Sequence, residues 1–178
     1  SGHFGSHVSM LYPCSILHGE NARCEFTGVT FASKGQHLDT GASVIHAAPH
    51  TSANISTRTI SKAGGIAAYR SAVKVMPNAH HAKCSVNCES LMLDDISRSD
   101  TLPVMDIQGD EADIGHEAKI GRISDEAVYY LMSRGISEDE ARAMIVRGFV
   151  EPIAKALPLE YAVEMNNLVN LELEGTMG

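Results

Sequence analysis

A four-residue pattern recurs along the first two thirds of the chain at a nearly constant interval. It occurs as Asn21-Ala22-Arg23-Cys24, Ser52-Ala53-Asn54-Ile55, His81-Ala82-Lys83-Cys84 and Glu111-Ala112-Asp113-Ile114. The alanines of the four copies are 31, 29 and 30 residues apart. An interval of this length is typical of stacked repeats in which each copy forms one layer. We therefore expect a mainly β solenoid whose strands pair with the rungs above and below.

The local sequence pattern changes near residue 123. Before it, short alternating runs bounded by turn residues predict strands, for example at 24–27, 42–45 and 72–76. After it the spacing of apolar residues is helical. We expect rungs over 8–123 and a small helical domain over 124–178. The polar Gly/His-rich segment 1–7 is expected to be a tag or a disordered start.

Capping signals place the first two predicted helices. Ser124 is a suitable N-cap for a helix over 125–134, and Gly135 is a suitable stop. Ser137 and Glu140 have the spacing of a capping box at the start of the second helix.

Two prolines shape the prediction for the rest of the domain. Pro152 is expected to interrupt the second helix, which would leave 151–156 as a short separate turn. A third helix is predicted over 159–174. Tyr161, Met165, Leu168 and Leu171 are predicted to lie on one apolar face of this helix.

Composition excludes several classes of protein. The formal net charge is -8, from 14 Lys plus Arg and 22 Asp plus Glu, and a nucleic-acid binder would need a basic surface. No run of 18 apolar residues predicts a membrane span. No signal peptide is visible, so the four cysteines are expected to be reduced thiols in the cytoplasm. Aromatic residues make up only 5%, and small and β-branched residues must fill the core.

Aligning the four copies predicts which side chains share a column of the solenoid. The first predicted column contains Cys24, Ile55, Cys84 and Ile114. Strand alternation then directs Cys84, Cys88 and His116 inward, whereas Glu117 points outward. A buried histidine requires hydrogen-bond partners, so His116 needs an explanation.

An ordered series of motifs carries a family resemblance. It consists of Asp39-Thr40-Gly41, Tyr69-Arg70, Asn87-Cys88-Glu89-Ser90-Leu91-Met92, Asp100-Thr101-Leu102-Pro103, Gly115-His116-Glu117-Ala118, residues 129–136, Ile145-Val146-Arg147-Gly148-Phe149, Leu157-Pro158-Leu159-Glu160-Tyr161-Ala162 and Leu173-Glu174-Gly175-Thr176-Met177-Gly178. From about Met10 to the last residue, the chain resembles the C-terminal part of the SufB/SufD family, scaffolds of SUF iron–sulfur cluster assembly. Cys88 and the Gly-His-Glu-Ala segment favour the SufB branch.

The resemblance implies a fold and a set of site residues. The family fold is a right-handed parallel β-helix followed by a small helical domain. Cys88 matches the family cysteine implicated in receiving persulfide sulfur and in building the cluster. His116 and Glu117 match the last two members of a Glu-His-Glu group, whose first member is replaced here by Gly115. Cys88, His116 and Glu117 are therefore the candidate ligands of a transient iron–sulfur cluster.

The resemblance also implies partners. SufC would hydrolyse ATP and contact the helical domain 124–178, SufD would pair with the solenoid, and SufE or SufU would donate sulfur, with reduced flavin a further candidate in the complex. The chain itself would be a scaffold and not an enzyme. Family members are more than twice as long and carry an upstream sulfur-entry cysteine, so the chain resembles a fragment. An open terminal rung could make such a fragment form homodimers.

Simpler alternatives stand beside each candidate residue. Cys88 could be a small core residue, since buried free cysteines are common. His116 could be a core histidine with ordinary partners, and Glu117 a solvated carboxylate. Cys14, Cys24 and Cys84 are expected to be packing residues. A purely structural, SufD-like solenoid without sulfur chemistry is the competing function.

Two further motifs suggest other chemistry. His80 and His81 lie close enough in sequence to Cys84 for a transition-metal site, although neighbouring strand residues point to opposite faces. Asp39-Thr40-Gly41 is similar to an aspartic-protease loop, with Ile120-Gly121-Arg122 as the second element of the retroviral type. The segment before Asp39 is polar where that fold needs an apolar strand, so a turn between rungs is the better interpretation.

Overall fold

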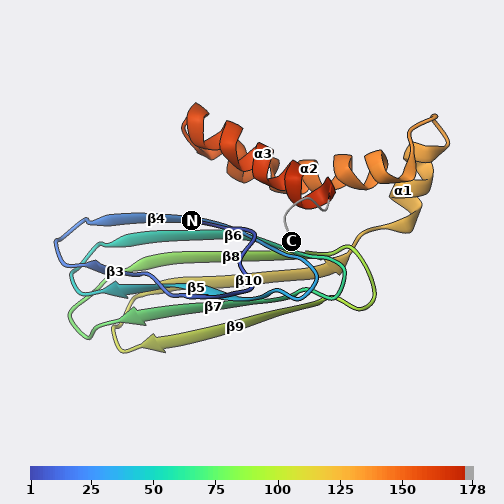
Figure 1. The fold of residues 1–178 in the computed structure, drawn as a ribbon. Coiled ribbons are helices and arrows are strands. Elements are labelled where there is room, and N and C mark those ends of the chain that lie inside the picture. Colours follow the sequence, from blue (N-terminus) through green and yellow to red (C-terminus); the bar gives the residue numbers. More distant parts are fainter. Residues whose placement is uncertain (175–178) are drawn as a thin grey trace.

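The computed structural model describes residues 1–174 and consists of a parallel β-solenoid followed by three helices (Figure 1). Its elements are β1 (Gly2–His3), β2 (Val8–Leu11), β3 (Cys14–Leu17), β4 (Arg23–Ala32), β5 (His37–His46), β6 (Ser52–Ser61), β7 (Ile66–Val75), β8 (Lys83–Met92), β9 (Arg98–Ile107), β10 (Asp113–Arg122), α1 (Asp125–Met132), α2 (Glu138–Ala156) and α3 (Leu159–Glu174). The predicted fold class is confirmed.

The strands form two parallel sheets. One sheet has the order β1-β4-β6-β8-β10, and we call it sheet A; the other has the order β2-β5-β7-β9, with β3 also pairing with β5, and we call it sheet B. From β3 to β10, successive strands along the chain alternate between the sheets. Each rung therefore stacks on the next through parallel hydrogen bonding, which requires both inner faces to be filled.

The segment 1–7, expected to be a tag or a disordered start, contains the short strand β1 and lies beside the first rung. Gly2 pairs with Val29 and His3 with Thr30 in a short strand of sheet A. The backbone N–H of Gly5 also donates to the carboxylate of Glu172 in α3, at 3.1 Å.

The register of the second rung differs from the predicted columns by two residues. Cys24 pairs with Ala53, which pairs in turn with Cys84, while Ile55 pairs with Phe26 and Val86. The repeated alanine of this copy therefore lies two residues later in the rung than in the other copies. Because side chains alternate with a period of two, the shift preserves the inward and outward faces. The prediction that Cys84 and Cys88 point inward thus survives the error in column membership.

The inner space divides into an apolar half and a polar half. The apolar half contains Val44, Ile55, Val73, Val75 and Val86, all fully or almost fully buried. Toward the other end of the same strands, small hydroxyl side chains replace them. These are Thr30, Thr40, Thr57, Thr59, Ser71 and Ser90.

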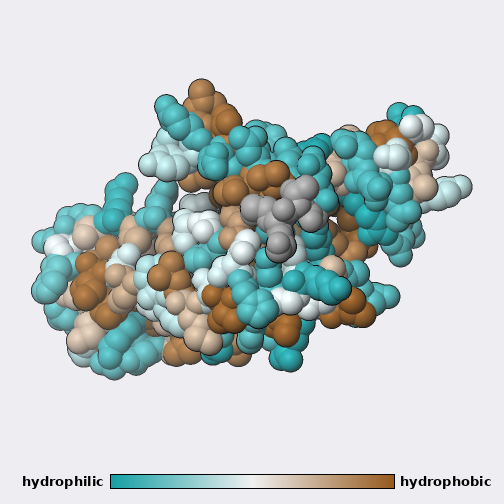
Figure 2. Space-filling model, viewed as in Figure 1, coloured by the Kyte–Doolittle hydropathy of each residue, from teal (hydrophilic) through white to brown (hydrophobic). Residues whose placement is uncertain are grey.

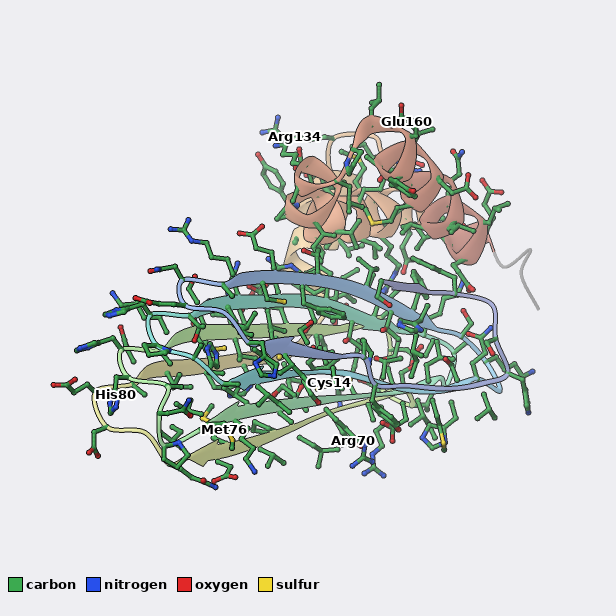
Figure 3. All side chains as sticks on the ribbon, turned by 90° about the vertical axis from the view of Figure 1, so that its left-hand side faces the viewer. Cys14, Arg70, Met76, His80, Arg134 and Glu160 are labelled. Atoms are coloured by element: carbon green, nitrogen blue, oxygen red, sulfur yellow. The ribbon has the colours of Figure 1, made fainter. Side chains whose placement is uncertain are left out.

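The helical domain lies over the outer face of sheet A (Figures 1 and 3). Val146, Val150 and Ile153 of α2 pack with Phe31 and Ile60 of the sheet. Figure 3 shows Arg134 and Glu160 on the side of this domain that faces away from the solenoid. Within the described residues, no helix is long and apolar enough to cross a membrane.

Two details of the helices correct the prediction. Helix α2 continues through Pro152 to Ala156, so 151–156 is not a separate turn. Packing of α2 on sheet A offsets the lost backbone hydrogen bond. The buried face of α3 carries Met165, Val169 and Glu172, whereas Tyr161 and Leu171 of the predicted face are exposed.

Candidate functional site

Cys88 lies inside the solenoid at the boundary between the apolar and polar halves. It is on β8, paired with Thr57 of β6 and Ala118 of β10, and its exposed fraction is only 2%. Burial raises the pKa of the Cys88 thiol, and the Thr57 hydroxyl partly opposes that rise by favouring the thiolate. The resting thiol is therefore neutral and shielded, and it needs exposure or a local charge to act as a nucleophile.

Tyr69 of β7 in sheet B contributes to the environment of Cys88. Burial raises the pKa of the Tyr69 phenol, and a negative charge on Cys88 raises it further. Its hydroxyl is buried and has no hydrogen-bond partner among the described residues. A buried donor without a partner is costly, so this hydroxyl is available to an acceptor that arrives in the interior. An anionic sulfur on Cys88 is such an acceptor.

His116 shares the interior with Cys88 but is not next to it along the strand. It is on β10 and pairs with Val86, whereas the partner of Cys88 on β10 is Ala118. Ordinary sheet spacing then puts the two Cα atoms roughly 8 Å apart. Nε2 of His116 is buried without a hydrogen-bond partner in the described structure. It is therefore not a core histidine with satisfied ring nitrogens.

Glu117 lies on the opposite face of β10. It is exposed, and its carboxylate forms an ion pair with Lys119 at 3.0 Å. The structure therefore brings Cys88 and His116 to the same interior and leaves Glu117 outside. Within residues 1–174, no three His, Cys, Asp or Glu side chains lie close enough to hold a metal ion together. A cluster at Cys88 would need ligands from another chain or a rearrangement of β10.

The remaining cysteines occupy different environments. Cys84 is 4% exposed and lies in the apolar half, where burial raises its pKa to about 11. Cys24 is partly buried, Cys14 is exposed, and all four thiols are free. Cys84 points into the solenoid interior, whereas His80 and His81 are exposed. Among the described residues, the structure therefore does not assemble the metal site suggested by their spacing. His81 instead stacks on His50, with ring centroids 5.0 Å apart, and pairs with Glu111.

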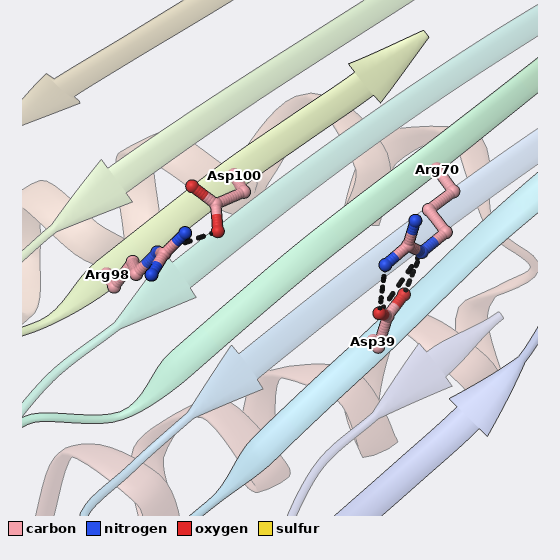
Figure 4. Close-up of polar contacts among 4 residues, drawn as sticks. All are labelled: Asp39, Arg70, Arg98 and Asp100. Carbon is pink, nitrogen blue, oxygen red and sulfur yellow. Dashed lines mark hydrogen bonds and ion pairs between the residues drawn. The ribbon is translucent and has the colours of Figure 1, made fainter. Parts of the chain in front are cut away.

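Asp39 lies within β5 and not in the expected turn between rungs, and its side chain has a partner on β7. Both of its oxygens accept hydrogen bonds from Arg70, with Nε–Oδ1 at 2.8 Å and Nη2–Oδ2 at 2.7 Å (Figure 4). These hydrogen bonds hold the pKa of Asp39 below its usual range. A bidentate ion pair on a solenoid strand is incompatible with two aspartates sharing a proton in a barrel, so the protease alternative is wrong.

The sequence did not predict which residues surround Cys88. Tyr69 belongs to one of the family motifs, but the sequence does not place it or Thr57 near Cys88, because that proximity depends on strand pairing and on how the sheets face each other. Arg58 and Glu89 form an ion pair on the outer face of the same strands. The correct register between β6 and β8 would predict this pair. Aligning the repeated alanines shifts the second rung by two residues and therefore hides it.

Comparison with known proteins agrees with this architecture. The family model for the SufBD core domain of the SUF system for iron–sulfur cluster assembly matches residues 1–149. The chain belongs to the SufB/SufD family. It is 49% identical over 177 residues to the iron–sulfur cluster assembly protein SufB of Bacillus subtilis. It is also 50% identical over 177 residues to a SufBD family protein of Mycobacterium tuberculosis.

These relatives are much longer than the chain. The match covers 99% of this chain in both cases, but only 38% of the Bacillus subtilis SufB and 21% of the mycobacterial protein. The similarity to SufB confirms the expected resemblance and supports a role in iron–sulfur cluster assembly. The roles of individual residues and the partners of this chain are taken up as proposals below.

Proposed function

We propose that this chain is the cluster-building part of a SufB-type scaffold and that Cys88 is its sulfur acceptor. The observation that carries the proposal is the position of Cys88, which is enclosed beside hydroxyl groups and one strand from the open end of sheet A. That last strand is β10, and no further strand of the described residues lies beyond it. A thiol placed there is covered at rest and would be reached when the strands beside β8 move.

The proposed sulfur step is an exchange between thiol and persulfide. The Cys88 thiolate attacks the terminal sulfur of a donor persulfide, a new S–S bond forms at Cys88, and the donor's S–S bond breaks. The donor leaves as a thiolate, which takes up the proton. The proposed donors to the anionic sulfur that results are the hydroxyl groups of Thr57 and Tyr69, which are buried without a hydrogen-bond partner among the described residues.

The proposed cluster is assembled with other chains. Cys88 supplies one thiolate and His116 a ring nitrogen; Glu117 would join only after β10 reorients. SufD is the proposed source of further ligands, SufE or SufU the sulfur donor, and SufC the ATPase. Reduced flavin is the proposed reductant, and the complex is proposed to be cytoplasmic. A site with few ligands of its own suits a cluster that must leave for an apo-protein.

The helical domain is the proposed contact for SufC. Tyr129 and Tyr130 are exposed on α1, and Arg134 packs over the Tyr130 ring at 4.7 Å. Exposed aromatic and arginine side chains are enriched at protein interfaces. ATP binding by SufC could then act on the solenoid through α2 and α3, which pack on sheet A.

A structural, SufD-like role is the second candidate. The outward position of Glu117 favours it, because that carboxylate lies on the other face of β10 from Cys88. Gly115 lies on the same outer face and supplies no carboxylate there. Sulfur loading separates the two functions.

The test is to incubate the complex with a persulfide donor under anaerobic conditions and to measure the mass of each cysteine peptide. The sulfur-acceptor function predicts a peptide one sulfur atom heavier at Cys88, absent in Cys88→Ser and retained in Cys84→Ser. Equal sulfur loading of Cys84 and Cys88, or none at Cys88, would leave the structural role as the function.

A further inference from the structure

An ion pair on the outside of sheet A lies under the helical domain. Arg58 of β6 and Glu89 of β8 occupy paired positions, and their side chains form a salt bridge. The two side chains are only 14% and 22% exposed. The Arg58 guanidinium also lies against the Phe149 ring of α2, with 5.1 Å between Cζ and the ring centroid. This cluster of three residues therefore joins two rungs to one helix.

The cluster depends on all three members. Nε of Arg58 is buried and has no hydrogen-bond partner among the described residues, and burial lowers the pKa of the guanidinium. The salt bridge to Glu89 and the contact with the Phe149 ring therefore offset the loss of solvation of the Arg58 guanidinium. Removing the carboxylate would leave that cation under α2 without its counter-charge, which strongly destabilises the local packing.

The same two strands carry Cys88 on their other face. Thr57 precedes Arg58, Cys88 precedes Glu89, and the register pairs Thr57 with Cys88 and Arg58 with Glu89. Neighbouring residues on a strand project to opposite faces. The outer ion pair and the inner thiol are consequently attached to adjacent backbone positions, with a single layer of sheet between them.

We propose that Arg58, Glu89 and Phe149 are positioning residues that keep Cys88 enclosed as long as α2 is packed on sheet A. Loosening α2 weakens the ion pair, allows this part of β6 and β8 to separate, and opens access to the thiol. The importance of Cys88 for sulfur transfer rests on the proposed function, but the control of its access does not. Thiol access can therefore be measured without sulfur or iron.

The experiment measures the rate at which N-ethylmaleimide modifies each cysteine of the folded chain, resolved by peptide mass spectrometry. Cys84 is the internal reference because it is buried on the same strand but lies in the apolar half. Glu89→Gln and Phe149→Ala are expected to speed modification of Cys88 about tenfold, as local opening becomes easier. Modification of Cys84 should change by less than about twofold, since global opening is not affected to the same degree.

Two further variants separate positioning from general destabilisation. Phe149→Tyr keeps the ring over Arg58 and should return the Cys88 rate to that of the unmodified chain. Asp106→Asn removes a carboxylate from a matched cross-rung pair, Lys74–Asp106 on sheet B, and should leave Cys88 unchanged. The proposal is overturned if Cys84 and Cys88 accelerate together, if neither responds, or if Asp106→Asn exposes Cys88 as much as Glu89→Gln does.

Discussion

Cys84 and Cys88 are four residues apart on β8 and face the same interior, yet their neighbours differ in chemistry. Cys84 packs among aliphatic side chains of the apolar half, whereas Cys88 has the hydroxyl of Thr57 beside it in the stack. An apolar wall favours only the neutral thiol, while a hydroxyl can also donate to a thiolate. The difference explains why Cys88 is the better candidate for sulfur chemistry and why Cys84 is a useful control.

Stability at alkaline pH should depend on Cys84. Its pKa in the folded chain is raised to about 11, while an unfolded chain has an ordinary thiol pKa of about 8.5. Between these values only the unfolded state loses the proton, so the free energy of unfolding falls as pH rises. We expect Cys84 to account for a loss of about 1–2 kcal/mol by pH 11.

Urea unfolding at pH 8 and pH 10.5 checks this contribution. Cys84→Ala should show a smaller decrease in the free energy of unfolding than the unmodified chain, whatever its absolute stability. Equal decreases in both proteins would mean that the Cys84 thiol is not shielded in the folded state.

The Asp39–Arg70 pair gives the opposite dependence on pH. The pKa of Asp39 is lowered by hydrogen bonds from Arg70, so the carboxylate stabilises the fold above its unfolded pKa and this contribution is lost in acid. We expect Asp39→Asn to lower the free energy of unfolding at pH 7 and to make much less difference at pH 3. Urea titrations at the two pH values measure the effect, and an equal loss at both would exclude the ion pair as its cause.

At the scale of elements, a buried carboxylate fixes the end of α3 to the solenoid. Glu172 is fully buried and accepts hydrogen bonds from the Ser33 hydroxyl at 2.5 Å and from the Gly5 N–H. The ammonium group of Lys62 donates to the Glu172 and Leu173 carbonyls at the C-terminal end of the helix. Cations are favourable at that end because the helix dipole is negative there.

Replacing Glu172 should therefore release α3. We expect Glu172→Ala to cost about 2–3 kcal/mol, because it leaves buried donors unsatisfied. The rate of amide hydrogen exchange should increase more in α3 and in the turn at Ser33 than in β6 or β8. Glu174→Ala, two residues away at an exposed position, is the matched control and should exchange like the unmodified chain. The same exchange in both variants would contradict the anchoring role.

The elements also show which features a single sequence can predict. Capping signals at Ser124 and Ser137 correctly placed the starts of α1 and α2, since the side chains of both serines accept N-cap hydrogen bonds. The continuation of α2 through Pro152 and the buried face of α3 depend on packing against sheet A. Local preference for a break at proline was outweighed by that tertiary contact.

The same distinction holds for the candidate site. Strand alternation was sufficient to direct Cys88 and His116 inward and Glu117 outward. It could not identify Tyr69, which comes from the opposite sheet, or the Arg58–Glu89 pair, which requires the correct register between rungs. The register error arose because successive copies are not equally long, so that aligning the repeated alanines shifted the second rung.

At the scale of the molecule, the solenoid ends with an uncovered rung. Met105, Ile107 and Ile120 occupy inward positions of β9 and β10 but remain substantially exposed, because no further rung among the described residues lies on them. Hydrophobic side chains also reach the surface of the solenoid among hydrophilic ones in Figure 2. Unpaired strand edges with apolar side chains favour pairing with another chain.

We expect the isolated chain to form a dimer through this rung. The molar mass from light scattering should approach twice the monomer value as concentration rises. Ile120→Lys should shift the equilibrium toward monomer, since it places a charge where a second rung would pack. Leu159→Lys, at an exposed position at the start of α3 and outside the rung, is the control. A monomer at all concentrations, or equal effects of the two lysines, would contradict pairing through this edge.

The central claim is that a SufB-type complex builds its cluster at Cys88. The most direct measurement is the amount of iron and acid-labile sulfide bound after anaerobic assembly of the full complex, purified through the proposed SufC partner. The account predicts bound iron and sulfide with visible cluster absorbance in the unmodified complex and in Cys84→Ser, and loss of all three in Cys88→Ser. A Cys88→Ser complex that retains the proposed SufC partner and assembles a normal amount of cluster would contradict the claim.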